Sequence, residues 1–476
     1  MADDDPMFRS AIDLAADVRA GTLSSRELVD ASLARIEELD GDLNAFVDVF
    51  ADDARAEADA IGSGDERPFA GVPIAIKNNR PIAGRRLTYA AEFMGDYTPE
   101  YDHNVVARLK AAGFVIVGQT TLPEWGILPW TNTKRFGATR NPWDRERVSG
   151  GSSGGSATAV AAGMVPIAHA NDGGGSTRIP AACCGLVGLK PARGRISVGP
   201  EAGESFLVAD GVLSRTVAET AAILDLLAGP TLGDSSWAPP PAEPFAASAG
   251  REPSGLRIAL TTTAPIDAPI DPARAQAVAD AGALLESLGH HVEEADPPWQ
   301  QPDLLRAFTG LFAPAVNLQV ALGRILSGRE PEEHEMEPVS WALWKLVTEE
   351  LSALDTTMAS AQVQIVARSL VAWMDQYDAV LTPALAEAPL TFDEVDWRTD
   401  DPMGLFARSG QFTPFTALAN VTGQPAITLP LYEHEGLPVG VHMIGRPAQE
   451  GALLALAAQL EAALPWIERR PTLTAA

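Results

Sequence analysis

The sequence predicts an α/β fold, in which helices cover a mostly parallel β-sheet. Short apolar segments that are typical of buried strands alternate with segments of helical periodicity along the 476-residue chain. With 46% hydrophobic and 21% charged residues, the composition is that of a globular protein with ample material for a core. We expect one large domain over residues 1–476, because no internal repeat or low-complexity tract divides the chain.

The first part of the chain already shows this order of elements. Residues 1–65 predict a helical N-terminal region. Residues 71–77 (GVPIAIK) predict a short buried strand that ends on a lysine. A helical pattern around residues 105–109 precedes an apolar strand at residues 114–118, and residues 157–164 predict a helix of small residues.

The remaining chain continues the alternation. Further strands are expected at residues 186–189, 256–260, 379–382 and 426–429, and further helices at residues 271–288 and 452–464. Residues 230–254, rich in proline, alanine, glycine and serine, predict a surface connection. Residues 300–375 predict a helical insertion that forms a cap over the functional site.

Charge and cysteine content narrow the class of protein. The net charge of −28 argues against nucleic acid or an anionic membrane as a partner. The acidic start at residues 1–5 lacks the apolar stretch of a secretory signal, and no uninterrupted apolar run approaches the ~18 to 20 residues of a membrane span. The neighbouring Cys183 and Cys184 are expected to be buried thiols rather than a disulfide. We therefore expect a cytoplasmic protein.

Two clusters rich in glycine and serine are the most informative feature of the chain. The first is residues 150–156 (GGSSGGS) and the second is residues 171–180 (NDGGGSTRIP). Taken alone, the first could be a flexible linker and the second a glycine-rich turn at a helix start. The apolar segments that flank the first cluster argue against a linker. Neither cluster is followed by the lysine of a phosphate-binding loop, so we do not expect a nucleotide site.

Ser176 is the candidate nucleophile of the second cluster. The three glycines before it allow the backbone to approach a ligand closely. Successive backbone N–H groups in such a turn can form a concave site that binds an oxyanion. Ser152 in the first cluster lies 24 positions earlier. We expect the two clusters to meet around one reacting centre.

A serine nucleophile needs a base, and Lys77 is the best candidate. None of the seven histidines lies in a motif that suggests a Ser-His-Asp triad, and the G-x-S-x-G pattern is absent. Lys77 ends a predicted buried strand, so burial would lower its pKa and favour the neutral amine that can accept a proton. The alternative is a lysine that extends from a strand end into solvent.

The motifs resemble the amidase signature family. The resemblance rests on residues 71–77, 150–156 and 172–180, which occur in the family's order. It continues through residues 184–191 (CGLVGLKP), 377–383 (YDAVLTP), 420–425 (NVTGQP) and 437–445 (LPVGVHMIG). It covers nearly the whole chain and is weakest over residues 230–250 and 300–375. It implies the amidase-signature fold, a central twisted mixed β-sheet with helices on both faces.

The resemblance also implies a Ser-cisSer-Lys triad. Ser176 would be the nucleophile, Ser152 the bridging serine and Lys77 the base, with a cis peptide bond between Gly151 and Ser152. The oxyanion would be bound by the backbone N–H groups of Gly173, Gly174, Gly175 and Ser176.

The same resemblance assigns supporting roles to neighbouring residues. Asp172 and Arg178 would pair and fix the second cluster, and Ser153 would add a hydrogen bond. Asn78 stands where the family commonly has aspartate. Our hypothesis is that the missing carboxylate favours neutral Lys77.

The expected reaction is hydrolysis of the C–N bond of an amide or carbamate (urethane) through an acyl-enzyme, with no metal or organic cofactor. Tyr97, Trp130 and Phe206 are predicted to line an apolar entrance, which favours apolar or aryl small-molecule substrates. The chain also resembles the aryl-amidase and urethanase branch of the family, which implies carbamates as well as aryl amides. We expect a monomer or homodimer. Two alternatives stay open: the amidase-like subunit of a glutamine-dependent tRNA amidotransferase, and a non-enzymatic binding protein on the same fold.

Overall fold

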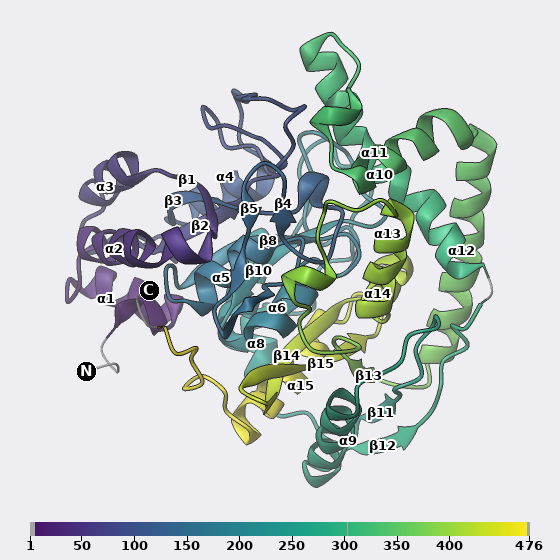
Figure 1. The fold of residues 1–476 in the computed structure, drawn as a ribbon. Coiled ribbons are helices and arrows are strands. Elements are labelled where there is room, and N and C mark those ends of the chain that lie inside the picture. The colour runs from purple at the N-terminus through teal and green to yellow at the C-terminus, as the bar shows by residue number, and fades with distance from the viewer. Residues whose placement is uncertain (1–4, 302, 474–476) are drawn as a thin grey trace.

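The computed structural model describes residues 5–301 and 303–473, so residues 1–4 of the acidic start lie outside the described residues. One large sheet forms the centre of the molecule (Figure 1). Its strands are β1 (Phe46–Val49), β2 (Pro73–Lys77), β3 (Val115–Thr120), β8 (Ile167–Asp172), β9 (Val187–Lys190), β10 (Ala209–Ser214), β11 (Arg257–Leu260), β12 (His291–Glu294), β13 (Ala379–Pro383), β14 (Ala426–His434) and β15 (Leu437–Gly445). They form an eleven-stranded sheet in the order β1-β3-β2-β8-β10-β9-β14-β15-β13-β11-β12.

The sheet is mixed, so the expectation of a mostly parallel sheet is wrong. Parallel pairing is confined to β2 with β3 and β8, and to β11 with β12 and β13. The other neighbouring pairs are antiparallel. One cause is the hairpin between β14 and β15, whose loop residues Glu435 and Gly436 both have positive φ. A two-residue loop of this kind joins antiparallel strands.

Helices cover both faces of the sheet, as the amidase-signature resemblance implies. They are α1 (Ala11–Ala20), α2 (Ser25–Leu43), α3 (Ala51–Asp59), α4 (Asn104–Ala111), α5 (Gly154–Ala161), α6 (Arg178–Cys184), α7 (Val217–Leu227), α8 (Phe245–Ala249), α9 (Pro272–Ser287), α10 (Leu304–Ser327), α11 (Pro338–Lys345), α12 (Ala353–Met374), α13 (Pro402–Phe412), α14 (Ala417–Thr422) and α15 (Glu450–Ala463). Two small two-stranded sheets, β4 (Asn132–Thr133) with β5 (Gly137–Ala138) and β6 (Arg140–Asn141) with β7 (Asp144–Val148), lie outside the main sheet.

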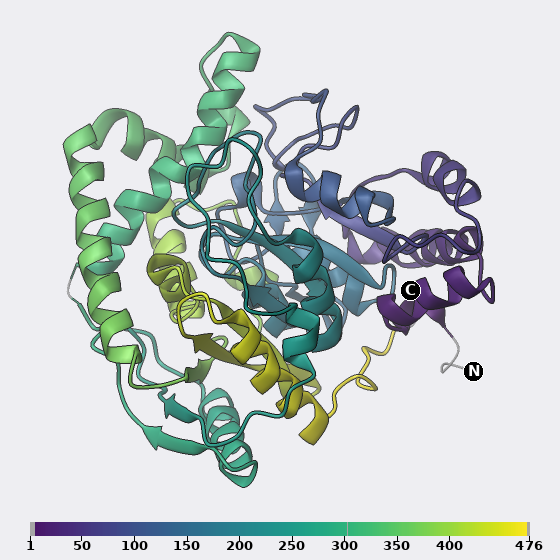
Figure 2. The same ribbon diagram turned by 180° about the vertical axis from the view of Figure 1, so that it is seen from behind.

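The alternation of side chains along β2 separates the two apolar layers. Ile74 and Ile76 belong to one buried cluster, whereas Ala75 belongs to the other. α5 and α6 pack in the layer of Ala75, and α4, α7 and α15 pack in the layer of Ile74. Figure 2 shows α7 in teal and α15 in yellow lying across that second face.

The N-terminal region contains a strand that sequence reasoning missed. Helices α1, α2 and α3 form as expected, and Ser24 caps α2 in a capping box with Glu27. Between α2 and α3, β1 pairs antiparallel with β3 at the edge of the main sheet. The segment is only four residues long, too short for a reliable period-two pattern.

The segment at residues 300–375 is mainly helical and lies at one side of the molecule (Figure 1). It comprises α10, α11 and α12, and α10 packs along α12. Among the described helices, α10 is the one whose length and apolarity would also suit a membrane span. Its apolar residues have another role in this fold, because several of them line the cavity described below.

Candidate active site

Lys77 lies at the end of β2, and its side chain is fully buried. Its Nζ lies 2.7 Å from Ser152 Oγ and 2.8 Å from Asn171 Oδ1. Burial, and then the positive charge of Arg80, lower the pKa of Lys77 well below its ordinary value. An amide oxygen can only accept, so Lys77 donates to Asn171. The lone pair of a neutral amine is then free to accept the Ser152 hydroxyl.

Ser152 lies in the loop between β7 and α5. The Gly151–Ser152 peptide bond is cis, which confirms the expectation from the resemblance. A Cβ atom at position 151 would lie 2.6 Å from the backbone N of Trp130, so the loop passes where only glycine fits. The glycine-rich composition therefore serves close packing, and the loop is not a flexible linker.

Ser153 joins the two glycine-rich clusters. Its backbone N–H donates to the carbonyl of Ser176 at 3.3 Å, and its hydroxyl donates to the carbonyl of Asn171 at 3.3 Å. Ser176 is half-buried between β8 and α6 and lines the same cavity as Ser152. Within the described part of the chain, no hydrogen bond links the two serine hydroxyls directly.

Asp172 and Arg178 form the expected pair at the base of the second cluster. Arg178 Nε and Nη2 donate to the two carboxylate oxygens at 2.9 Å each, and both side chains are fully buried. Burial alone would raise the pKa of Asp172, but Arg178, together with Asn420 and Lys190, outweighs burial and holds this pKa well below its ordinary value. The pair ties the end of β8 to the start of α6 and so fixes the loop between them.

The structure changes the predicted set of oxyanion donors. The N–H of Gly175 donates to Asp172 Oδ1 at 2.7 Å, so it supports the loop and does not face the cavity as a free donor. Among the described hydrogen bonds, none gives the N–H groups of Gly173, Gly174 or Ser176 a protein acceptor. These three residues line the cavity.

The side chain of Asn78 makes its contacts away from Lys77, and the hypothesis that the missing carboxylate favours neutral Lys77 stays a prediction. Its Oδ1 accepts from the N–H of Thr88 at 2.9 Å, and its Nδ2 donates to the carbonyl of Arg86 at 2.9 Å. The side chain is thus occupied in holding the loop at residues 86–88. The nearby carboxylates that raise the pKa of Lys77 are Asp172 and Asp210.

A cavity of about 210 Å³ opens beside the two serines. Its walls are mainly apolar and come from α10, from the loop and helices at residues 406–421 and from residues 125–129. The aromatic residues that line it are Tyr89, Trp125, Phe308, Phe312 and Phe406. Arg80 also lines it, and its guanidinium is paired with the buried carboxylate of Asp210. The cavity therefore suits an uncharged, largely apolar ligand.

The three aromatic residues predicted for the entrance do not line this cavity. Trp130 is fully buried in the core, and Tyr97 packs against the same core cluster. Phe206 lies under the guanidinium of Arg193, at 3.9 Å from its ring centroid. Proximity in sequence to the motifs suggested these positions, whereas the real lining comes from distant segments.

Asn171 is the contact of Lys77 that sequence reasoning missed as a functional residue. It is the fifth residue of the buried strand β8 and opens the second cluster. Its Nδ2 donates to Asn79 Oδ1 at 3.0 Å, which orients the amide oxygen toward Lys77. A buried amide at the end of a strand carries no signal in a single sequence that separates it from a structural polar residue.

The comparisons with known proteins define the class as a hydrolase that acts on carbon–nitrogen bonds. The family model Amidase matches residues 27–454, and the chain belongs to the amidase family. The chain is 36% identical over 474 residues to 6-aminohexanoate-cyclic-dimer hydrolase of Paenarthrobacter ureafaciens, covering 96% of this chain and 95% of that enzyme.

Solved structures agree with this assignment. The structure of 6-aminohexanoate cyclic dimer hydrolase complexed with substrate has a TM-score of 0.92 and 34% identity, and covers 98% of this chain and 99% of that chain. A bacterial aryl acylamidase of the amidase signature family has a TM-score of 0.87 and 25% identity, and covers 98% of this chain and 99% of that chain. The predicted family and fold class are thus confirmed.

Proposed function

We propose that the protein hydrolyses uncharged, apolar amides by covalent catalysis at Ser176. The observation that carries this proposal is the contact of 2.7 Å between buried Lys77 Nζ and Ser152 Oγ, in a cavity that Ser152 shares with Ser176. Burial favours the neutral amine, which is the form a general base needs.

In the first half-reaction, Lys77 accepts the proton of Ser152, and Ser152 accepts the proton of Ser176. The Oγ of Ser176 then forms a bond to the carbonyl carbon, and the oxyanion is bound by the N–H groups of Gly173, Gly174 and Ser176. When the tetrahedral intermediate collapses, the C–N bond breaks and the proton returns through Ser152 to the leaving amine. Water, deprotonated by the same relay, then hydrolyses the acyl-enzyme and restores the Ser176 hydroxyl.

The cavity supports a substrate without free charges. Arg80 is the charged group on its lining, and Asp210 already neutralises it. A cyclic amide has neither a free ammonium nor a free carboxylate, and the similar 6-aminohexanoate-cyclic-dimer hydrolase is named for such a compound. Aryl amides are equally uncharged, and an aryl carbamate presents the same carbonyl to Ser176. We propose these as the substrate class, with cyclic and aryl amides ahead of charged amides.

A turnover panel tests this proposal. The panel contains the cyclic dimer of 6-aminohexanoate, an anilide, an aryl carbamate, a linear amide with free ends and glutamine. We expect kcat/KM to be highest for an uncharged cyclic or aryl substrate and activity to be lost in Ser176→Ala. Preferred turnover of glutamine would instead favour the amidotransferase-subunit alternative. Absence of turnover and of covalent labelling at Ser176 would favour a binding protein.

A further inference from the structure

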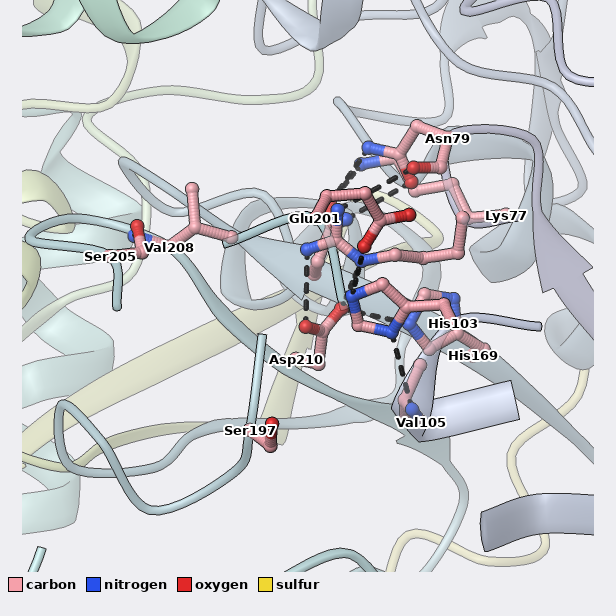
Figure 3. A network of polar contacts seen from close by, with 12 residues as sticks. Lys77, Asn79, His103, Val105, His169, Ser197, Glu201, Ser205, Val208 and Asp210 are labelled. Atoms are coloured by element: carbon pink, nitrogen blue, oxygen red, sulfur yellow. Dashed lines mark hydrogen bonds and ion pairs between the residues drawn. The ribbon is translucent and has the colours of Figure 1, made fainter. Parts of the chain in front are cut away.

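We propose that Arg80 and Asp210 act as positioning residues that set the pH range over which Lys77 serves as a base. This inference rests on the proposed function, because it concerns the same lysine. The pair is not part of the predicted triad, and its two members are 130 residues apart in the chain. Figure 3 shows Asp210 together with Lys77, His169 and the neighbouring polar side chains.

The sheet brings Asp210 next to the lysine. Asp210 on β10 is the direct cross-strand partner of Asn171 on β8, and Asn171 contacts Lys77. Directly opposite residues of an antiparallel pair leave the sheet on the same face. His169, two residues before Asn171, lies on this face as well and bonds to Asp210 Oδ1 through its Nε2 at 3.1 Å. The four side chains therefore form one buried polar group.

Arg80 is held against this group by a two-point contact. Its Nε and Nη2 donate to Asp210 at 2.8 and 3.1 Å. The side chain of Asp210 is fully buried, and that of Arg80 is 14% exposed. The turn after β2 directs Arg80 back toward the site, because its N–H donates to the carbonyl of Lys77 at 3.2 Å. Arg80 therefore lines the cavity and also contacts Asp210 of the buried polar group.

The two charges act on Lys77 in opposite directions. Burial and Arg80 lower the pKa of Lys77, whereas Asp172 and Asp210 raise it. Asp172, which raises this pKa more than Asp210 does, is paired with Arg178, and Arg80 opposes both carboxylates at the amine. Loss of the guanidinium would leave a bare carboxylate near Lys77, and loss of the carboxylate would leave a bare guanidinium.

Other titratable side chains lie in or around the buried polar group of Lys77, Asn171, Asp210 and His169. They are Tyr89, His103, His169, Asp172 and Glu201. Burial lowers the pKa of His103 to about 3 and also lowers the pKa of His169, so both rings are neutral near pH 7. Burial, and then the nearby Glu201, raise the pKa of Tyr89, which keeps it neutral. The charges that act on Lys77 are therefore those of Arg80, Asp172 and Asp210, and the Arg80–Asp210 pair contributes one charge of each sign.

The test measures kcat/KM against pH for Arg80→Met, Asp210→Asn and the double variant. The pH dependence of kcat/KM reports the pKa values of the free enzyme and not those of the bound complex. We expect the acid limb to move to higher pH in Arg80→Met and to lower pH in Asp210→Asn, with each pKa unit changing the neutral fraction of Lys77 about tenfold. The charge-neutral double variant should return close to the wild-type limb. Arg80→Lys keeps the positive charge and should largely restore the profile.

Arg195→Met is the matched control. Arg195 forms a buried two-point pair with Glu450, at 2.7 and 3.0 Å, away from the cavity lining. Its loss should lower the melting temperature without moving the acid limb. If Arg80→Met and Asp210→Asn leave the limb unmoved, or move it in the same direction, the proposal is overturned.

A second readout separates this inference from the proposed function. The chain has only five lysines, so 13C-ε-lysine NMR can follow the titration of Lys77 without any substrate, with Lys77→Met as the assignment. Opposite shifts of the Lys77 resonance in the two variants would support the pair even if every amide in the panel failed. An unchanged titration would overturn the inference even if the wild-type enzyme hydrolysed amides.

Discussion

The proposed role of Lys77 as a base requires that its surroundings stay free of unpaired negative charge. The contact from Asn171 is neutral, and it supplies an acceptor without adding a carboxylate. The fully buried amine therefore keeps a low pKa, although two aspartates lie close enough to raise it. A negative charge introduced at Asn171, a position that the family resemblance did not single out, should therefore raise the pKa of Lys77.

Asn171→Asp should move the acid limb of kcat/KM to higher pH. The change keeps the size of the side chain but places a carboxylate 2.8 Å from Nζ, which stabilises the ammonium form. We expect activity at pH 7 to fall by about tenfold or more and to recover as the pH rises. The pH–rate profile measures this.

Asn78→Asp serves as the comparison for Asn171→Asp. Because the amide of Asn78 is bonded to Thr88 and Arg86, this variant should disturb the loop at residues 86–88 and move the limb less. A larger shift in Asn78→Asp than in Asn171→Asp would show that the family aspartate position controls Lys77 after all.

The three catalytic candidates could be predicted from the sequence, but several contacts that support them could not. The motif resemblance brought Lys77, Ser152 and Ser176 together, and the structure places all three around one cavity or in direct contact. It could not predict that Gly175 donates to Asp172, because that depends on the turn of the chain after β8. Nor could it find the contact of Arg80 with Asp210, since long-range pairing leaves no trace in one sequence.

At the level of elements, α10 is the main contribution of the segment at residues 300–375 to the cavity. Phe308 and Phe312 stack on one another with ring centroids 5.4 Å apart, and both face the cavity. Phe308→Ala should raise KM for an apolar amide about tenfold while changing kcat little, because it removes apolar contact made equally before and during the reaction. Steady-state kinetics measure the two constants.

Leu318→Ala is the control on the same helix. Leu318 is 63% exposed and does not line the cavity. Both constants should stay at the wild-type value. If Leu318→Ala raised KM as much as Phe308→Ala, the effect would come from helix stability and not from the cavity wall.

A pair of buried carboxyl groups, Glu124 and Glu337, joins α11 to the short 3-10 helix Glu124–Gly126. The N–H of Glu337, just before α11, donates to Glu124 Oε2 at 2.9 Å, and Glu337 Oε1 accepts from the N–H of Lys134 at 2.8 Å. Burial raises the pKa of Glu124 to about 7, and burial together with Glu124 raises the pKa of Glu337. The folded protein thus binds protons more tightly here than the unfolded chain does.

This pair makes stability depend on pH. The pKa of Glu124 is about 7 in the folded protein and 4.5 in the unfolded chain. The contribution of Glu124 to the free energy of unfolding is therefore greatest below pH 4.5 and is lost as the pH rises toward 7. Glu124→Gln keeps an acceptor for the N–H of Glu337 and removes this titration. We expect the variant to be about 2–3 kcal/mol more stable relative to wild type at pH 8 than at pH 4.5.

Urea unfolding at the two pH values measures the difference. Glu461 also has a pKa raised to about 7 by burial, but it caps α7 through the N–H of Val217, far from α11. Because its pKa is raised in the same way, Glu461→Gln should show a stability difference of the same sign. An equal stability difference at both pH values in Glu124→Gln would contradict the assignment.

For the whole molecule, the dominant physical quantity is the net charge of −28. Charges of one sign repel each other in the compact state, and salt screens this repulsion over a distance of about 10 Å at 0.1 M. Raising NaCl from ~10 mM to ~300 mM should therefore raise the melting temperature by a few degrees. Scanning calorimetry tests this, and a melting temperature that falls with salt would show that attractive ion pairs dominate instead.

At the scale of the whole molecule, the reaction class could be predicted from the sequence, but the substrate preference could not. The motif segments contain β2, β9, β13 and β15 and adjoin β8 and β14 in the main sheet, so fold and reaction class followed from the resemblance. The cavity wall comes largely from α10 and from residues 406–421, and the family resemblance is weakest over residues 300–375. Substrate preference is decided there by packing between distant segments, which a sequence pattern does not specify.

The most direct test of the central claim is the site of covalent modification by a serine-directed fluorophosphonate, mapped by peptide mass spectrometry near pH 8. We predict one adduct on Ser176 in the wild-type protein, no adduct in Ser176→Ala and strongly slowed labelling in Lys77→Met. An adduct on another residue, or an undiminished labelling rate in Lys77→Met, would contradict the account.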